Sequence, residues 1–199
     1  MTQPTAQAVR VLFGLGNPGS EYERTRHNAG FWFIDRLAEA AGARWLGESK
    51  MHAMVARLPG HVLLVKPTTF MNRSGLCVSA VLNYYKLPSE SALIAHDELD
   101  LPVGVARLKF DGGHGGQNGL RDIQTQLGHG RFGRLRLGIG HPGDKTLVTP
   151  WVLGRPSVAQ EQAIREAIDA ALAVVDTLTA GHWDRAMQQL HQPAKPGPR

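Results

Sequence analysis

A histidine and an acid occupy positions at which proton transfer could be arranged. His27 comes immediately before residues 28–41, whose apolar side chains recur at helical spacing. The first turn of a helix carries partial positive charge, which disfavours imidazolium and predicts a neutral His27 able to accept a proton. Asp97 ends the apolar strand predicted over 92–97, where its carboxylate could orient an imidazole. The alternatives are a capping histidine and a solvated acid.

A glycine-rich segment is the second chemical feature. Residues 112–119 hold five glycines in eight positions. Glycine allows φ above zero and close approach, so backbone N–H groups near Gly115 could turn towards an anion or a carbonyl. Asn118 is the predicted N-cap of a helix over 118–127, which Gly128 ends. A flexible surface loop is the alternative for the glycines.

A third segment, residues 66–72, joins a predicted strand to a predicted helix. Phe70 and Met71 could form an apolar wall for a substrate. Asn72 is either a simple N-cap or an amide that donates to a substrate carbonyl. With the glycine-rich backbone, Asn72 could supply hydrogen-bond donors to the oxygen of such a carbonyl.

Other chemistries find less support. Residues 14–19 match the dinucleotide pattern G-x-G-x-x-G, but Pro18 and Gly19 form a turn where that pattern needs a helix to open. A dinucleotide-dependent oxidoreductase is therefore a less favoured alternative. His96, Asp97 and His114 lack metal-ligand spacing, so no metal site is expected. Cys77 lies on an apolar helical stripe and no serine lies in a G-x-S-x-G context, which favours direct attack by water.

The predicted elements alternate between strands and helices. Strands are predicted over 9–15, 92–97, 105–110 and 135–139, with a hairpin of 51–58 and 61–66 joined at Pro59-Gly60. Helices are predicted over 28–41, 72–86, 118–127 and 158–180. This order predicts an α/β fold, a mixed and mostly parallel twisted sheet flanked by helices, with ligands at the carboxyl ends of its strands.

Composition limits the organisation and the partners. The chain has 199 residues, 42% of them hydrophobic, which predicts a single domain over 1–192 followed by a polar, disordered tail over 193–199. It has no apolar run of the roughly 20 residues needed to span a bilayer, no signal-peptide pattern and one cysteine, so a cytoplasmic protein is expected. The net charge of +5 indicates an anionic partner. Basic residues gather around the glycines: Arg107, Lys109, Arg121, Arg131, Arg134, Arg136 and Lys145.

Six segments, in this order and spacing, are similar to the signature segments of bacterial peptidyl-tRNA hydrolase. They are 14–19 (GLGNPG), 25–30 (TRHNAG), 67–72 (PTTFMN), 96–100 (HDELD), 112–119 (GGHGGQNG) and 136–143 (RLGIGHPG). The resemblance runs from Val9 to about Leu190. It implies hydrolysis of the ester between a peptide and the terminal ribose of tRNA, and so the recycling of peptidyl-tRNA. It also implies no cofactor, no obligatory protein partner and a cytoplasmic monomer.

The resemblance also implies roles for single residues. His27 resembles the general base, Asp97 the acid that holds it, and Asn17 the residue that separates blocked from free aminoacyl-tRNA. Lys109 and Arg136 match residues that hold a tRNA phosphate. The predicted substrate-contacting residues are Tyr22, Phe70, Met71, Asn72, Gly115 and Asn118.

One position departs from the family pattern. Gln117 stands where a histidine is common, so it can hydrogen-bond but cannot titrate. A non-catalytic tRNA-binding module stays open as an alternative. A contact between His27 and Asp97 would favour the hydrolase, because a module that only binds RNA does not need it.

Overall fold

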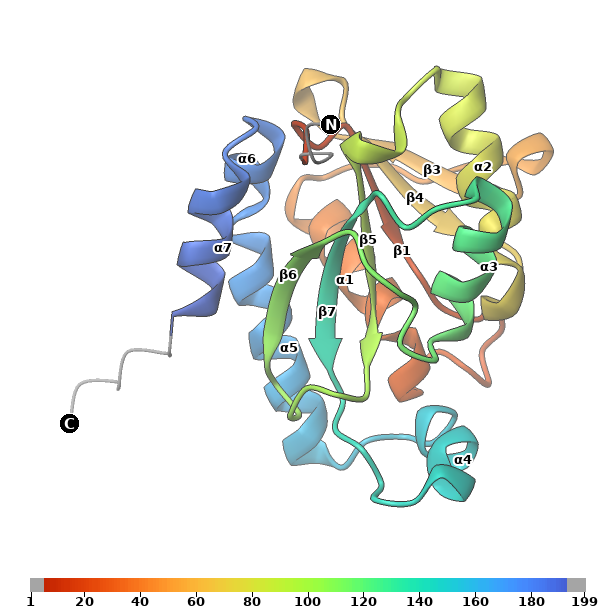
Figure 1. Ribbon diagram of the computed structural model, residues 1–199, viewed down its shortest axis with the longest axis vertical. Coiled ribbons are helices and arrows are strands. Elements are labelled where there is room, and N and C mark those ends of the chain that lie inside the picture. The colour runs from red at the N-terminus through yellow and green to blue at the C-terminus, as the bar shows by residue number, and fades with distance from the viewer. Residues whose placement is uncertain (1–5, 193–199) are drawn as a thin grey trace.

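The computed structural model describes residues 6–192, and within them one seven-stranded sheet forms the centre of the molecule (Figure 1). Its order is β2-β3-β4-β1-β5-β7-β6. The strands are β1 (Val11–Gly14), β2 (Leu46–Glu48), β3 (Ala53–Arg57), β4 (Leu63–Pro67), β5 (Ala92–Glu98), β6 (Ala106–Phe110) and β7 (Gly133–Gly138). The four central strands β4, β1, β5 and β7 are mutually parallel, whereas β2, β3 and β6 pair in antiparallel fashion. The predicted α/β fold with a mixed, mostly parallel sheet is confirmed.

Helices cover both faces of the sheet. They are α1 (Ala29–Ala40), α2 (Ser74–Tyr85), α3 (Asn118–Leu127), α4 (Val148–Val152), α5 (Val158–Leu172), α6 (Val175–Thr179) and α7 (Trp183–His191). One buried cluster joins α1, α5, α6 and α7 to one face, and a second joins α2 and α3 to the other. Because both faces are covered, β1 is buried along its whole length, as its apolar sequence predicts.

The long helix predicted over 158–180 is wrong, since it is two helices. α5 ends at Leu172, and α6 begins at Val175 after a break at Ala173 and Val174. The change of direction keeps Val174, Val175 and Leu178 buried in the same core as α5. The helical spacing of apolar residues continues from α5 through the break into α6, so the sequence pattern did not reveal that the helix ends at Leu172.

The start of α1 can lie directly against the sheet because Gly30 has no side chain. A Cβ atom there would lie 2.4 Å from the Ala95 oxygen and 2.5 Å from the Leu15 oxygen, far inside van der Waals contact. Only glycine therefore lets α1 begin this close to β1 and β5. The 3-10 turn η1 (Arg26–Asn28), which carries His27, is thereby placed at the carboxyl end of β5.

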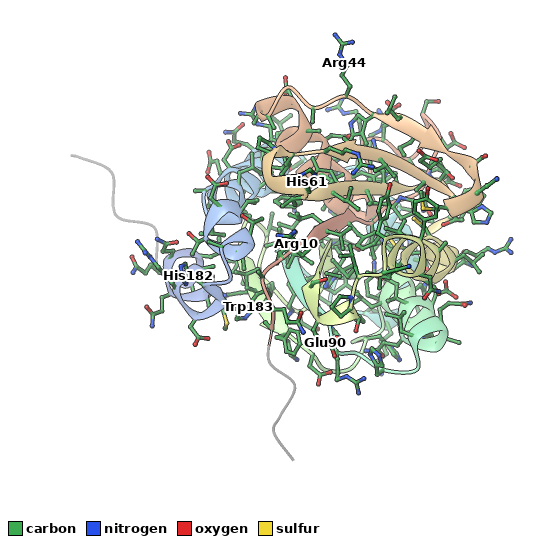
Figure 2. The ribbon with its side chains drawn as sticks, turned by 90° about the horizontal axis from the view of Figure 1, so that it is seen from above. Arg10, Arg44, His61, Glu90, His182 and Trp183 are labelled. Carbon is green, nitrogen blue, oxygen red and sulfur yellow. The ribbon has the colours of Figure 1, made fainter. Side chains whose placement is uncertain are left out.

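The amino ends of the four parallel strands form the other end of the sheet. Figure 2 looks onto that end, where Arg10, Arg44 and His61 lie. Beside it, α7 covers the edge strand β6: Trp183 meets Phe110 edge-to-face, with ring centres 6.1 Å apart. The Leu108 N–H on that edge donates to His191 Nε2 at 2.9 Å, so part of the open edge is already satisfied.

Candidate active site

A cavity of about 390 Å³ opens at the carboxyl ends of β1 and β5. In Figure 1 it lies at the end to which the arrows of β5 and β7 point, near α4. The sequence-predicted residues that line it are Asn17, His27, Phe70, Met71, Asn72, Asp97, Gly115 and Asn118. Segments far apart in the sequence therefore meet at one place, as expected for the carboxyl end of a parallel sheet.

His27 and Asp97 are in direct contact inside this cavity. His27 Nδ1 lies 2.8 Å from Asp97 Oδ2, and the two residues are 7% and 3% exposed. An ionised carboxylate can only accept, so Nδ1 donates to it and Nε2 is the nitrogen left to take a proton. This is the arrangement required of a base held by an acid.

The charges of the pair stabilise each other. Burial lowers the pKa of His27, but the negative charge and the hydrogen bond of Asp97 raise it, and the net direction is upward. Burial raises the pKa of Asp97, but His27 and the hydrogen bond from Gln117 hold it below its ordinary value. The carboxylate in contact with His27 therefore has a larger effect on its pKa than the partial positive charge expected of a helix start.

Gln117 is the second donor to Asp97. Its Nε2 lies 2.9 Å from Asp97 Oδ1, and its Oε1 accepts from the Leu120 N–H at 2.8 Å. The Asp97 carboxylate can only accept and the Leu120 N–H can only donate, so these two partners fix the orientation of the Gln117 side-chain amide. Gln117 thus caps α3, and the predicted N-cap Asn118 is wrong: Asn118 Oδ1 instead accepts from Arg121, within the first turn of the helix.

Arg134 anchors the glycine-rich segment. The two terminal nitrogens of Arg134 donate to the carbonyl oxygens of Gly112 and Gly113, and the residue as a whole is 3% exposed. Further along, Gly115 and Gly116 have φ of 56° and 84° and line the cavity. The segment is an anchored wall of the cavity, whereas the sequence suggested for Arg134 only a role in attracting an anion.

Asn17 is fixed by three hydrogen bonds. Its backbone N–H and C=O bond to the side chain of Asn28 at 2.8 and 2.9 Å, and its Oδ1 accepts from the Met71 N–H at 2.7 Å. Within residues 6–192 its Nδ2 has no hydrogen-bond partner. The free group of Asn17 is therefore a donor.

Phe70 and Met71, the predicted apolar wall, line the same cavity as His27. Met71 is buried, whereas Phe70 is 53% exposed and meets Tyr22 edge-to-face with ring centres 6.1 Å apart. Tyr22 itself lies outside the cavity lining. Asn72 is not an N-cap, because it lies in the 3-10 turn η4 (Met71–Arg73) and α2 begins at Ser74 without a side-chain cap. Its amide is exposed at the cavity.

A wall that the sequence did not indicate comes from the α4 segment. Val148, Thr149, Val152 and Leu153 line the cavity. Arg26 holds this segment: its guanidinium stacks 3.7 Å from the Trp151 ring centre and donates to the Trp151 oxygen at 3.1 Å. A five-residue helix gives too little periodicity to be recognised, so only the fold reveals this wall.

Comparison with known proteins shows the family of this chain. The family model of peptidyl-tRNA hydrolase matches residues 11–197. The chain belongs to the peptidyl-tRNA hydrolase family. It is 56% identical to a peptidyl-tRNA hydrolase of Xanthomonas campestris over 191 residues, covering 94% of this chain and 99% of that protein. It is 57% identical to one of Stenotrophomonas maltophilia over 188 residues, covering 93% and 98%. A crystal structure of peptidyl-tRNA hydrolase from Acinetobacter baumannii superposes with a TM-score of 0.90 at 47% identity, covering 93% and 95%.

Of the two basic residues expected from the peptidyl-tRNA hydrolase resemblance, Arg136 bonds a residue of the cavity, whereas Lys109 lines a separate cavity with His182 and Trp183. Lys109 on β6 is opposite Arg134 on β7, and Arg136 is opposite Arg107, so Lys109 and Arg136 are diagonal neighbours on one face. Neither lines the cavity that holds His27. Arg136 Nε bonds Glu98 Oε2 at 2.8 Å, and Glu98 does line the cavity.

Among residues 6–192, no three His, Cys, Asp or Glu side chains are grouped so that they could hold a metal ion. None of the helices in that range is both long enough and apolar enough to cross a membrane. The tail predicted to be disordered, 193–199, lies outside the described residues.

Proposed function

We propose that His27 activates a water molecule to hydrolyse the ester between a peptide and the terminal ribose of tRNA. The family assignment makes this protein a peptidyl-tRNA hydrolase, and its substrate peptidyl-tRNA. The observation that carries the mechanism is the 2.8 Å contact between buried His27 and Asp97 in a cavity that also presents amides. A module that only bound tRNA would not need this contact.

The reaction needs one proton carrier and one oxyanion site. Water attacks the ester carbon while its proton passes to His27 Nε2, and Asp97 stabilises the imidazolium that forms. The negative oxygen of the tetrahedral intermediate is held by the Asn72 amide and the glycine-rich backbone around Gly115. The ester C–O bond then breaks, and the ribose oxygen takes the proton from His27. The peptide leaves as an acid and the tRNA as an alcohol.

Asn17 supports selection of a blocked substrate. Its free Nδ2 can donate to a carbonyl oxygen, and only a peptidyl nitrogen carries an acyl carbonyl. A free aminoacyl ester presents an ammonium group instead, which an amide N–H cannot bind. Asn17 would therefore distinguish peptidyl-tRNA from aminoacyl-tRNA by a donor that the second leaves unpaired.

The rest of the substrate is bound outside the cavity. Lys109 and Arg136 would bind one phosphate of the tRNA, with the two terminal nitrogens of Arg136 free to donate while Nε stays on Glu98. Tyr22, Phe70, Met71 and Asn118 would contact the groups next to the ester. We place the activity in the cytoplasm, in a monomer. Against the oxidoreductase alternative, α1 begins only at Ala29, well after Gly19.

One experiment tests the mechanism. Purified His27→Ala and Asp97→Asn variants are assayed on a peptidyl-tRNA and on the matching free aminoacyl-tRNA. We expect wild type to cleave only the first, His27→Ala to lose about 10²–10⁴-fold in kcat with tRNA affinity within a few-fold, and Asp97→Asn to lose less. His61→Ala, at the opposite end of the sheet, is the control (Figure 2). Near-normal turnover by His27→Ala would exclude His27 as the base.

A further inference from the structure

A second cavity, of about 370 Å³, adjoins the catalytic cavity. Asn17 lines both. From there the second cavity extends past Asn28 and the residues that follow β1 and β4, including Thr68. We call it the β1–β4 cavity. A group bound at His27 and passing over Asn17 would enter it directly.

The β1–β4 cavity has polar lining residues such as Glu23 and Asn28, and one part of its wall is apolar. Phe31 and Trp32 contribute from α1, and Met54 from β3. The Trp32 indole is fixed because its Nε1 donates to the Glu23 oxygen at 2.7 Å. Aromatic and thioether surfaces of this kind bind hydrocarbon side chains.

The cationic group at this cavity is already neutralised. Lys66 Nζ bonds both carboxylate oxygens of Asp35 at 2.8 Å and lies 4.9 Å from the Phe31 ring centre. A phosphate would therefore meet Asp35 together with Lys66 and gain little. The chemistry favours a neutral, apolar ligand over a nucleotide.

The order of sites along the sheet indicates which ligand that is. β6 and β7 carry Lys109 and Arg136, β5 and β1 lead to the ester site, and β1 and β4 lead to the β1–β4 cavity. Figure 1 shows β6, β7, β5 and β1 side by side in this order. The substrate has the same linear order of tRNA, ester and peptide. With tRNA on the β6–β7 side, the peptide leaves the ester towards β4.

We propose that the β1–β4 cavity binds apolar side chains of the substrate peptide that precede the esterified residue. This rests on the proposed function, because the tRNA side and the ester site fix the direction of the peptide. The enzyme would then bind longer apolar peptides better than a single blocked amino acid, with the chemical step unchanged.

The test compares two substrates with the same tRNA and the same esterified residue. One carries an N-acetyl group, and the other carries three further leucines. We expect wild type to show a KM about tenfold lower for the longer substrate, at similar kcat, because part of the added apolar surface is buried.

Variants then locate the effect. Thr68→Trp fills the β1–β4 cavity from an exposed position and should remove the KM advantage of the longer substrate, leaving the KM for the N-acetyl substrate within twofold. Met54→Ala removes one wall and should reduce the advantage in the same direction. Ala170→Trp, at an exposed position of α5 that lines neither cavity, is the control and should keep it.

The outcomes separate this proposal from the mechanism. Equal KM values for the two substrates in wild type, or an advantage that survives Thr68→Trp, would overturn the peptide site while hydrolysis continued. Failure of wild type to cleave either substrate would instead overturn the proposed function. If Thr68→Trp is inactive on both substrates, the Met54→Ala variant decides. An unchanged KM advantage of the longer substrate in Met54→Ala would also overturn the proposal.

Discussion

The contact between His27 and Asp97 makes opposite demands on activity and on stability. A base must be neutral to take a proton from water, whereas the ion pair is strongest when His27 is charged. Asp97 raises the pKa of His27 despite burial, so part of the population is protonated above pH 6.5, the ordinary pKa of a histidine. The acid limb of the kcat profile should therefore lie above that value.

The stability of the pair should show the opposite pH dependence. A raised pKa of His27 stabilises the fold fully below the unfolded value of 6.5 and loses that contribution as pH rises through the folded pKa. Asp97, whose pKa is lowered, contributes above its ordinary 3.8 and loses its contribution as pH falls through its folded pKa. Urea unfolding of wild type and His27→Ala should thus differ most between about pH 4 and 6.5. A difference independent of pH would contradict this electrostatic account.

Gln117 allows a test of how Asp97 is positioned. Gln117→Ser keeps a helix-capping oxygen but cannot reach Asp97, so the carboxylate loses one of its two donors. We expect kcat to fall about tenfold, since hydrogen bonds to charged groups are the strong ones. The acid limb should move to higher pH, because less of the charge on Asp97 is shared with Gln117.

The control for Gln117 is a charge change at the same position. Gln117→Glu keeps the oxygen that caps α3 and places a carboxylate beside Asp97, so the limb should move further upward. His27, His96 and Glu98 are the other titratable groups near Asp97, and neither variant alters them. If the two variants change only the melting temperature, Gln117 serves the helix alone.

Residue types, together with the place of Asp97 at a strand end and of His27 before a helix, were enough to suggest that these two side chains meet. Gln117, Asn28 and Arg134 could not be assigned in this way, because their partners are other loops. Gln117 meets Asp97 across 20 residues, and Asn28 meets Asn17 across 11. Such bonds depend on the register of strands, and a sequence does not display that register.

Elements with long apolar patterns were the ones that could be predicted. The buried strands β1 and β5 and the hairpin of β3 and β4 follow from composition and from Pro59-Gly60. Helix starts were less predictable. Asparagine is a common N-cap, but neither Asn72 nor Asn118 is the N-cap of a helix. Asn72 lies in a 3-10 turn that precedes α2, and Gln117 is the N-cap of α3 in place of Asn118.

The glycine-rich segment depends, as an element, on Arg134. Arg134→Lys loses the two-nitrogen contact with Gly112 and Gly113, which a single ammonium cannot replace. We expect about 2 kcal/mol lower stability in urea unfolding and a lower kcat, because the cavity wall at Gly115 and Gly116 is released. Arg131→Lys, in an exposed ion pair with Glu90, is the matched control and should change stability by less than about 0.5 kcal/mol. Equal losses in both variants would deny Arg134 this role.

At the scale of the whole molecule, the catalytic cavity and the basic residues of β6 and β7 lie on different parts of the sheet. Loops after β1, β4 and β5 build the catalytic cavity, and α4 closes one side of it. Basic side chains of β6 and β7 share one face of the sheet, and one of them, Arg136, is linked to the cavity through Glu98. The net charge of +5 therefore attracts tRNA generally, whereas Lys109 and Arg136 would set where it is held.

A double variant, Lys109→Ala with Arg136→Ala, tests this division. A phosphate contact remote from the ester contributes almost equally to ground-state and transition-state binding, so KM should rise with little change in kcat. The slope of log affinity against log salt should become shallower by about 0.7–0.9 per lost contact. The control is Arg10→Ala with Arg44→Ala at the opposite end of the sheet, which removes the same two charges (Figure 2). If both double variants change KM and the salt slope equally, the effect is one of net charge, and the tRNA is not held by Lys109 and Arg136.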